Sequence, residues 1–480
     1  MRLFRVNSSK VGSCSGLATH PPVLIPWTST HFQQMSNTRT EEIEFTETST
    51  GRDFTTFQSA GIVNSSNDDV PASAVEAIPD GGYGWTVVFA CSVVTFMITG
   101  WTGSWGIIQT ALIQKYPTRE SAISLSFVGT LSIALCVSLG LASVRLSQLI
   151  GARYSMLLGV LLMSFGILCS SFTVDNLGGL FVAPGIAFGL GCSLTYTMSN
   201  NLPVQWFSSK LGTANGLVKL GGGLGATIMA VAVQALIDRV GIPWTLRILG
   251  LVSLASGVPA ALLVRERFPS NNASFINLSL FNSMPFCCLF LAGAVGTFAL
   301  FVPPYFLPLF AHSIGLSAST GAGIVAAFNA CTAIGRFGAG FACDRFGSTN
   351  MLLLTMALNA VSMLAIWPLS DAIAPLIVFA AINGIANGAF FVTMPTAIGR
   401  MIEPGQAAVG MGMAITGWTG GYLMGSPIAG MLIAATGAEQ AHTVGPYRAA
   451  IFYAGGMALA SAAFVAVARV RMDTKLIKKI

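Results

Sequence analysis

The stretch from Phe328 to Gly347 reads FNACTAIGRFGAGFACDRFG, an apolar run with two arginines in different settings. Arg345 stands beside Asp344 in what we expect to be a turn, where water or the carboxylate can satisfy its charge. Arg336 has no charged residue within seven positions on either side. A charge inside hydrocarbon is costly and usually marks a binding site or a pathway. Arg336 is therefore the first candidate for a functional residue.

The rest of the chain shares this apolar character. Of its 480 residues, 53% are hydrophobic and 9% are charged, whereas a soluble globular chain carries about 25% charged residues. Apolar blocks of roughly 20 residues follow one another, each long enough to cross ~30 Å of hydrocarbon as a helix. We predict about twelve spans, at residues 84–106, 121–144, 154–173, 177–199, 212–236, 243–264, 285–311, 317–339, 349–368, 372–397, 407–434 and 446–468. The fold class is an all-α polytopic membrane protein.

The spans form two similar sets. The loop RLSQLIGARYSMLLG after the second span and the loop FACDRFGSTNMLLLT after the eighth both place a glycine between a polar hinge and a new apolar run. The Gly-dense fifth span also has a counterpart in the eleventh, GMGMAITGWTGGYLMG. Two six-helix halves with a substrate between them near the membrane midplane make the major facilitator architecture. The expected order is a disordered cytoplasmic tail (1–78), an N-terminal half (79–264), a cytoplasmic central loop (265–283), a C-terminal half (284–468) and a short cytoplasmic tail (469–480).

The tail and the basic residues bear on location. Residues 1–78 are rich in Ser, Thr, Asn and acid, with no apolar period, and the true start can be Met1 or Met35. Lys and Arg near helix ends tend to stay in the cytoplasm. With the N-terminus inside, the larger basic set is cytoplasmic: Arg145, Arg153, Lys210, Arg265, Arg267, Arg345, Arg400, Arg469, Arg471, Lys475, Lys478 and Lys479. We therefore expect both termini inside and a plasma-membrane location, with a vacuolar or mitochondrial membrane as alternatives.

Arg247 and Arg448 stand near the outer ends of their predicted spans, so Lys219 and Arg336 are the charged residues left inside the spans, and all eighteen acids fall elsewhere. Two cations without a buried carboxylate attract an anion, and a guanidinium can bind a carboxylate through two hydrogen bonds. Both residues are therefore predicted to bind substrate. The alternative for Arg336 is extension to the cytoplasmic interface. For Lys219, about 12 Å into the fifth span, it is a hydrogen bond to helix carbonyls or to Asn215.

A glycine run and a proline cluster add local expectations. Gly221, Gly222, Gly223 and Gly225 are expected to allow close helix packing, because no strand precedes them and their spacing does not fit a nucleotide-binding loop. The seventh span contains FVPPYFLPLF, whose three prolines, at 303, 304 and 308, should interrupt the helix.

Aromatic residues near these features are further candidates. Backbone breaks in a membrane are tolerated beside a cavity, so Tyr305 and Phe306 are predicted to contact substrate or form a gate. Trp105, with Trp101, has the same prediction near the outer end of the first span. The alternative for all of them is an aromatic belt at the membrane interface.

Three stretches carry a family resemblance. The first span begins with PDGGYGW (Pro79 to Trp85), and QWFSSKLGTANGLVKLGGGLG (Gln205 to Gly225) leads into the fifth. Both resemble the signature stretches of the monocarboxylate transporter family, in its fungal-type branch. The DRFG at 344–347, with Gly340 before it, resembles the loop motif general to major facilitators. The resemblance assigns conformational roles to Asp80, Gly81, Gly82, Trp85, Lys210, Gly340, Asp344, Arg345 and Gly347.

The resemblance implies proton-linked or facilitated movement of small monocarboxylates by alternating access, with Arg336 receiving the carboxylate. Two departures remove the groups expected to carry a coupled proton. Animal members have an acid one turn before that arginine, where this chain has Thr332, and a lysine late in the first span, where it has Gly103. A protonated substrate or a titrating Lys219 is an alternative proton carrier. Asn329, two turns before Arg336, would suit an anion larger or more polar than lactate.

The leading expectation is a secondary active or facilitative transporter of a small organic anion, with or without a proton. The first alternative is a porter for a bulkier or neutral metabolite, such as a vitamin or an exported secondary metabolite. A non-transporting membrane sensor or accessory protein is the second. An enzyme is not expected, because His312 and His442 stand alone in outer loops and no nucleophile and base can be paired within the membrane. The expected partners are the substrate and the lipid bilayer, with no metal, cofactor or nucleic acid.

Overall fold

The structure is a computed structural model that describes residues 80–115, 119–267, 276–403, 406–436 and 445–473. All of these residues belong to one compact unit, which begins at Ser73. Every regular element in the described ranges is helical, which confirms the all-α fold class. The predicted disordered tail and the choice between Met1 and Met35 lie outside the described residues.

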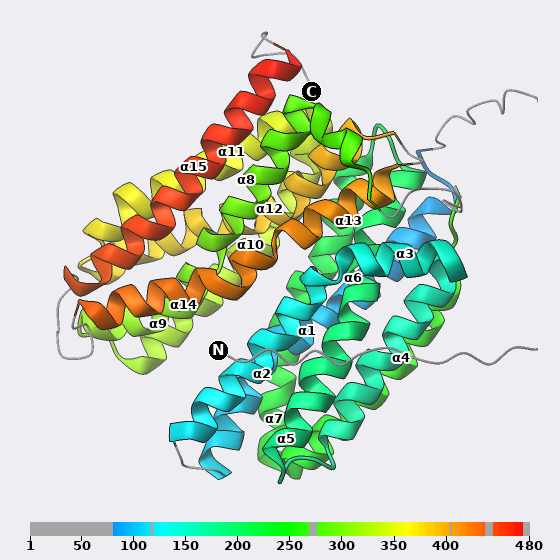
Figure 1. The fold of residues 1–480 in the computed structure, drawn as a ribbon. Helices are drawn as coiled ribbons and strands as arrows, with labels where there is room; N and C mark the ends of the chain where they lie inside the picture. Colours follow the sequence, from blue (N-terminus) through cyan, green and yellow to red (C-terminus); the bar gives the residue numbers. More distant parts are fainter. Residues whose placement is uncertain (1–79, 116–118, 268–275, 404–405, 437–444, 474–480) are drawn as a thin grey trace, which may run out of the picture. The chain divides into compact units, whose positions relative to one another are not determined.

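The helices form two groups along the chain (Figure 1). The first half consists of α1 (Gly84–Lys115), α2 (Arg119–Ser138), α3 (Gly140–Ile150), α4 (Ala152–Ser170), α5 (Leu177–Leu180), the π-helical segment η1 (Phe181–Ala187), α6 (Phe188–Trp206) and α7 (Leu211–Leu263). A short 3-10 segment, η2 (Leu278–Asn282), precedes the second half. That half consists of α8 (Met284–Leu300), α9 (Val302–Ser313), α10 (Ala318–Phe346), α11 (Ser348–Val361), η3 (Ser362–Ile366), η4 (Trp367–Leu369), α12 (Ile373–Met401), α13 (Ala407–Gly417), α14 (Thr419–Ala435), η6 (Gly445–Tyr447) and α15 (Arg448–Met472).

These helices are consistent with the twelve predicted spans. In the described part of the chain, 9 helical stretches are long and apolar enough to cross a membrane, and the bent pair α2 and α3 adds another. The 53-residue α7 holds two spans, because Gly241 interrupts it with φ 75° and ψ 171°. Helices α13 and α14 meet at Trp418 and together cover the predicted span 407–434.

The prolines of the seventh span break the helix only once. Helix α8 ends at Leu300, and α9 begins at Val302 with Pro303 and Pro304 in its first turn, where missing N–H groups cost nothing. Pro308, in contrast, lies inside α9, so the expected interruption there is wrong. The break therefore falls at Phe301.

The turn expected around Arg345 is also wrong. Helix α10 continues through Phe346, so Arg345 is an exposed residue of its last turn. The chain turns at Gly347, whose φ of 93° suits a residue without a Cβ atom. Helical continuation is favoured here because cations are stabilised at a helix C-terminus.

The internal repeat is visible in the backbone. Gly151, between α3 and α4, has φ 84° and ψ 154°, and Gly347, between α10 and α11, has φ 93° and ψ 141°. The two loops singled out in the sequence thus turn through the same conformation.

The glycine-rich helices repeat as well. Gly221 and Gly225 of α7 approach the backbone of α1 at Ser92 and Phe96, leaving no room for a Cβ atom. In the second half, Gly425 of α14 approaches the backbone of α8 at Phe298 in the same way. Glycines in corresponding helices therefore permit corresponding close contacts.

The two halves meet chiefly along α7 with α10 and along α3 with α13. A Cβ atom at Gly340 of α10 would lie 2.7 Å from the carbonyl oxygen of Gly212 and 3.0 Å from Cα of Gly216. Likewise, a Cβ atom at Gly140 of α3 would lie 3.3 Å from the carbonyl oxygen of Gly412 in α13. The halves thus touch almost backbone to backbone.

Candidate functional site

Lys219 and Arg336 lie together where α7 of the first half crosses α10 of the second. Nη1 of Arg336 donates a hydrogen bond to the backbone carbonyl oxygen of Lys219 over 3.3 Å. Glycines of α7 make this approach possible, since a Cβ atom at Gly222 would lie 3.2 Å from Nη1 of Arg336 and one at Gly223 would lie 2.9 Å from Cβ of Ala333. The predicted close packing of the glycine run is confirmed, and the run also makes room for the guanidinium.

The guanidinium does not extend toward the end of its own helix. Helix α10 continues from Arg336 to Phe346, about 15 Å at 1.5 Å per residue, so the predicted end at residue 339 was too early. Nε of Arg336 has no hydrogen-bond partner among the described residues. The one hydrogen bond observed for this side chain is therefore made to the opposite half.

Lys219 is buried, and no counter-ion for it is found among the described residues. It is 3% exposed, and Nζ has no hydrogen-bond partner in the described part of the chain. Nζ lies 4.5 Å from the centroid of the Tyr196 ring, a cation–π contact that attracts the ammonium without neutralising it. The amide of Asn215, the expected alternative partner, donates instead to Oγ1 of Thr396 over 2.9 Å.

Four aromatic side chains link the two cations. The hydroxyl of Tyr196 of α6 lies near that of Tyr422 of α14. The Tyr422 ring lies 4.6 Å from that of Phe301, at the break between α8 and α9, and Phe301 lies 6.4 Å from Phe391 of α12. Cζ of Arg336 lies 5.6 Å from the Phe391 ring centroid. The contacts therefore close into a circuit.

We call the members of this circuit the central cluster: Lys219, Arg336, Tyr196, Tyr422, Phe301 and Phe391. Both halves contribute to it, and every member except Lys219 keeps part of its surface exposed. On the two helices that carry the cations, the acids are Asp238 of α7 and Asp344 of α10. Asp238 lies about 28 Å along α7 from Lys219, and Asp344 pairs with Arg400. The cluster thus holds two cations facing aromatic rings.

The other predicted site residues lie apart from these contacts. Asn329 is exposed on α10, seven residues and thus about 10 Å before Arg336 on the same helix face. Trp105 is 8% exposed, and its Nε1 donates to the carbonyl oxygen of Leu125 over 3.3 Å. Tyr305 is 57% exposed, whereas Phe306 is half-buried against Gly430 of α14. Substrate contact by these four residues stays a prediction.

The four aromatic residues of the central cluster were missed from sequence. Each is one aromatic residue among many in an apolar span, and periodicity cannot separate a face toward lipid from a face toward the other half. Phe301 had the best signal, since it directly precedes the proline pair. The residue at the break joins the central cluster, rather than Tyr305 or Phe306 after it.

The two signature stretches pack against each other. A Cβ atom at Gly84 would lie 2.9 Å from Cβ of Trp206, and the Trp85 ring lies 4.7 Å from that of Phe207. Gly82 has φ 58°, which a glycine adopts without strain. This arrangement brings the chain before α1 to the loop before α7.

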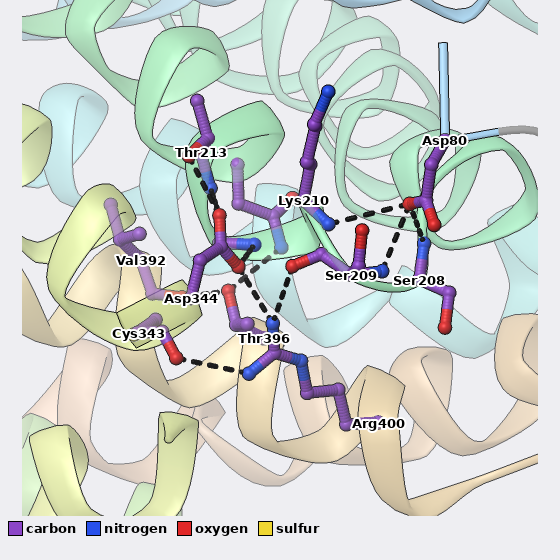
Figure 2. A network of polar contacts seen from close by, with 12 residues as sticks. Asp80, Ser208, Ser209, Lys210, Thr213, Cys343, Asp344, Val392, Thr396 and Arg400 are labelled. Carbon is purple, nitrogen blue, oxygen red and sulfur yellow. Dashed lines mark hydrogen bonds and ion pairs between the residues drawn. The ribbon is translucent and has the colours of Figure 1, made fainter. Parts of the chain in front are cut away.

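Two carboxylates from different halves hold the N-terminus of α7 (Figure 2). One oxygen of Asp80 accepts hydrogen bonds from the backbone N–H groups of Ser208, Ser209 and Lys210, at 2.7, 2.9 and 3.3 Å. Burial acts to raise the pKa of Asp80, but these donors outweigh it and hold the pKa below its ordinary value. The carboxylate is therefore stabilised in its charged form.

Asp344 supplies the second carboxylate, from the end of α10. It accepts from the N–H groups of Gly212 and Thr213, at 2.8 and 2.7 Å, and from the Thr213 hydroxyl at 2.6 Å. Lys210, the residue at the N-cap position, makes no side-chain cap. Asp344 therefore caps α7 from the opposite half. It plays the part that an aspartate at the N-cap position plays for its own helix.

Arg400 of α12 completes this network, and sequence reasoning did not select it. Its Nη2 lies 2.6 Å from Oδ1 of Asp344 and 3.3 Å from the carbonyl oxygen of Ser209, and its Nη1 donates to the carbonyl oxygen of Cys343 over 3.0 Å. Of the predicted motif residues, Lys210 takes part only through its backbone, and Arg345 lies over the Phe346 ring at 5.6 Å. The network stands about two turns from the central cluster along both α7 and α10.

Comparisons with known proteins identify the family and the fold of the chain. The sequence profile of the Major Facilitator Superfamily matches residues 90–332 and 289–479. The chain is 28% identical over 407 residues to MFS-type transporter 1 of an Ophiocordyceps species, covering 84% of this chain and 89% of the relative. It is 28% identical over 363 residues to the aspyridones efflux protein of Emericella nidulans, covering 75% and 74%.

A solved structure shows the same fold. The human organic anion transporter MFSD10 superposes with a TM-score of 0.64 at 13% identity, covering 80% of this chain and 100% of that one. The monocarboxylate branch suggested by the signature stretches is not specifically supported by these matches. With a profile match over most of its length, two halves related by an internal repeat and helices consistent with twelve spans, the chain belongs to the major facilitator superfamily of membrane transporters.

Proposed function

We propose that the protein exports an organic acid bulkier than a simple monocarboxylate, by alternating access of a site between its two halves. The cation pair of Lys219 and Arg336 carries this proposal. The two cations repel each other, and Nζ of Lys219 and Nε of Arg336 have no hydrogen-bond partner among the described residues. An anionic group is the ligand that supplies what both cations lack.

Size and direction have separate support. The four aromatic rings of the central cluster offer a surface much larger than lactate needs. A relative that aligns with three quarters of this chain is named an efflux protein, which supports outward transport of a metabolite. Export from the cell in turn favours the plasma membrane, and the distribution of Lys and Arg favours the cytoplasmic placement of both termini.

Proton movement, if coupled, depends on few groups. The Thr332 hydroxyl donates to the carbonyl oxygen of Phe328 in its own helix, and a Cβ atom at Gly103 would lie 3.1 Å from Cβ of Ala226. Neither Thr332 nor Gly103 has an ionisable side chain that could exchange a proton with the site. The proton would travel on the substrate or on Lys219. A transport rate that stays unchanged over about two pH units near neutrality would contradict both routes.

The test is release of entrapped labelled acids from proteoliposomes that contain the full chain, comparing wild type with Arg336→Ala and Arg336→Lys. Loss of charge-assisted hydrogen bonds should lower transport about tenfold or more for Arg336→Ala. Arg336→Lys should recover little, because an ammonium cannot bind a carboxylate with two parallel bonds. Arg239→Ala, an exposed arginine elsewhere on α7, is the matched control and should behave as wild type.

Transport of small monocarboxylates is the second candidate, favoured by the direct contact between the two signature stretches. Lactate and pyruvate in the same assay distinguish it, since a carrier for them should show saturable release and competition by either acid. If neutral isosteres are released as fast as acids, and Arg336→Ala changes nothing, the porter acts on neutral metabolites and the proposed acid binding is wrong.

A further inference from the structure

The central cluster has one cationic side and one aromatic side, and we propose that it selects organic acids whose acidic group is attached to a planar unsaturated ring. This inference rests on the proposed function and adds the chemical class of the substrate. It concerns the same site, because the aromatic residues touch both Lys219 and Arg336.

The cationic side fixes where the acidic group lies. Arg336 is half-buried, with Nε among the buried atoms, and we place the acidic group against the accessible part of its side chain. Lys219 is 3% exposed, behind the Tyr196 ring, so it acts on the ligand through its charge. The acidic group should therefore contact Arg336 and lie on the side of α10 and α7.

The aromatic side begins immediately beside that position. The Phe391 ring centroid lies 5.6 Å from Cζ of Arg336, and Phe301 and Tyr422 follow at aromatic-pair distances of 6.4 and 4.6 Å. A ring bonded directly to a carboxylate held by Arg336 lies within reach of these faces and edges. Planar rings gain more from such neighbours than saturated rings of the same size, because the aromatic quadrupoles add to burial.

The two tyrosines add a reason for planarity. Tyr196 and Tyr422 come from different halves and their hydroxyls lie near each other, so the central cluster extends across the interface. A ligand that stays flat can lie against the circuit without separating the two tyrosines. A puckered ring has greater thickness and contacts fewer of the four rings at once.

Binding to the purified full chain in nanodiscs, measured by calorimetry, tests the inference with three probes. They are 2-naphthoate, decahydro-2-naphthoate, which has the same carbon skeleton without planarity, and 2-naphthalenemethanol, which is planar and neutral. We expect 2-naphthoate to bind about tenfold more tightly than the saturated acid. The neutral alcohol should bind at least as weakly as the saturated acid.

Variants assign the preference to the aromatic side. Phe391→Leu should bring the ratio of the two acid affinities from about ten toward one, while decahydro-2-naphthoate binding stays close to wild type. The matched control is Phe337→Leu on α10, an exposed residue whose ring pairs with Phe341 at 5.0 Å. Equal thermal unfolding of the unliganded variants shows that both are folded.

Each outcome has one meaning. Equal binding of the planar and saturated acids, still dependent on Arg336, overturns the ring selectivity and leaves the proposed function standing. Binding of the neutral alcohol as tight as that of 2-naphthoate, with no effect of Arg336→Ala, overturns the proposed acid binding. Failure of all three probes to bind contradicts both.

Discussion

At the scale of single residues, Gly222 decides how close α7 comes to Arg336. A Cβ atom there would lie 2.7 Å from Oγ1 of Thr99 and 3.2 Å from Nη1 of Arg336. The threonine can rotate away, but the guanidinium is held by the Lys219 carbonyl and must shift by a few tenths of an ångström. A single methyl group can therefore misplace the acid-binding group.

Gly222→Ala should weaken acid binding about tenfold, with destabilisation of about 1–3 kcal/mol from overpacking. The control is Gly338→Ala on α10, where a Cβ atom would meet nothing within 4 Å. Calorimetric titration with 2-naphthoate measures the effect. Equal affinities for the two variants would show that Arg336 tolerates displacement and does not set the position of the acid.

The charged residues of the site could be predicted at this scale, whereas the aromatic ones could not. Lys219 and Arg336 are recognisable because a charge in an apolar run is rare and costly. Tyr196 and Tyr422 are chemically ordinary residues of apolar spans, and only their contact across the interface distinguishes them. The same limit applied to Arg400, whose partner Asp344 is 56 positions away in sequence.

At the scale of elements, the N-terminus of α7 shows how loops and helices are joined. Its first N–H groups lack partners within the helix, as at any helix start. The local sequence offers only Lys210 at the cap position, so the acceptors come from Asp80 before α1 and Asp344 in the last turn of α10.

Asp80→Ala should lower the free energy of unfolding by about 1–2 kcal/mol, because three N–H groups lose their acceptor. Asp80→Asn keeps an oxygen acceptor without the charge and should cost less. Thermal unfolding of the purified chain measures both, with Glu403→Ala, an exposed acid, as control. An unfolding temperature equal to that of wild type in Asp80→Ala would show that water replaces the carboxylate at no cost.

The pH dependence follows from the lowered pKa of Asp80. Its stabilising effect is fully present above the ordinary aspartate pKa of about 3.9 and is lost as the pH falls through the lower folded value. The difference in stability between wild type and Asp80→Asn should therefore stay constant from pH 7 to about 5 and shrink only in stronger acid. Unfolding measured across this range checks the sign; a difference that shrinks already near neutral pH would contradict it.

The existence of the helices was predictable from apolar runs, and most of their ends were not. Spans of about 20 residues fix the number of crossings, but helices extend beyond the apolar core wherever caps and polar turns allow. Helix α10 passes its predicted end because Arg345 suits a helix C-terminus and Gly347 then turns the chain. Pro308 gave the opposite error. An interruption was predicted there, but the loss of one backbone hydrogen bond did not end α9.

At the scale of the whole molecule, the Asp344 network holds the two halves together at one end. It lies beside the close approach of Gly340 to Gly212, where a side chain would not fit. Cys343, next to Asp344, is 0% exposed. This cysteine is therefore a natural reporter for separation of the halves at that end.

Asp344→Ala should speed alkylation of Cys343 by a maleimide about tenfold, because it removes the acceptor of two N–H groups, one hydroxyl and Arg400. Arg400→Ala should have a smaller effect, since Asp344 would still cap α7. Mass spectrometry of the peptide that contains Cys343 gives the rates, and Cys169, which is exposed, is the internal control. Unchanged labelling in Asp344→Ala would show that the glycine contacts alone keep this end closed.

The way the halves face each other was predictable only in outline. The repeat and the loop motifs indicate two halves with a site between them, but no pattern in the sequence pairs Gly212 with Gly340 or Asp344 with α7. Those pairings are contacts between distant segments, and they depend on how two complete bundles dock.

The two carboxylates that accept hydrogen bonds at the N-terminus of α7 also bear on how fast the transporter can turn over. Asp80 belongs to the same half as α7, whereas Asp344 belongs to the other. When the halves part, only the donors of Gly212 and Thr213 must exchange a carboxylate for water, because Ser208, Ser209 and Lys210 keep theirs. Because Asp80 stays in place and only Asp344 leaves, the activation barrier for separation of the halves stays low. The loss of Asp344 still raises the free energy of the open form. At this helix end, the balance between those two forms then depends on the detachable Asp344 carboxylate together with its partner Arg400.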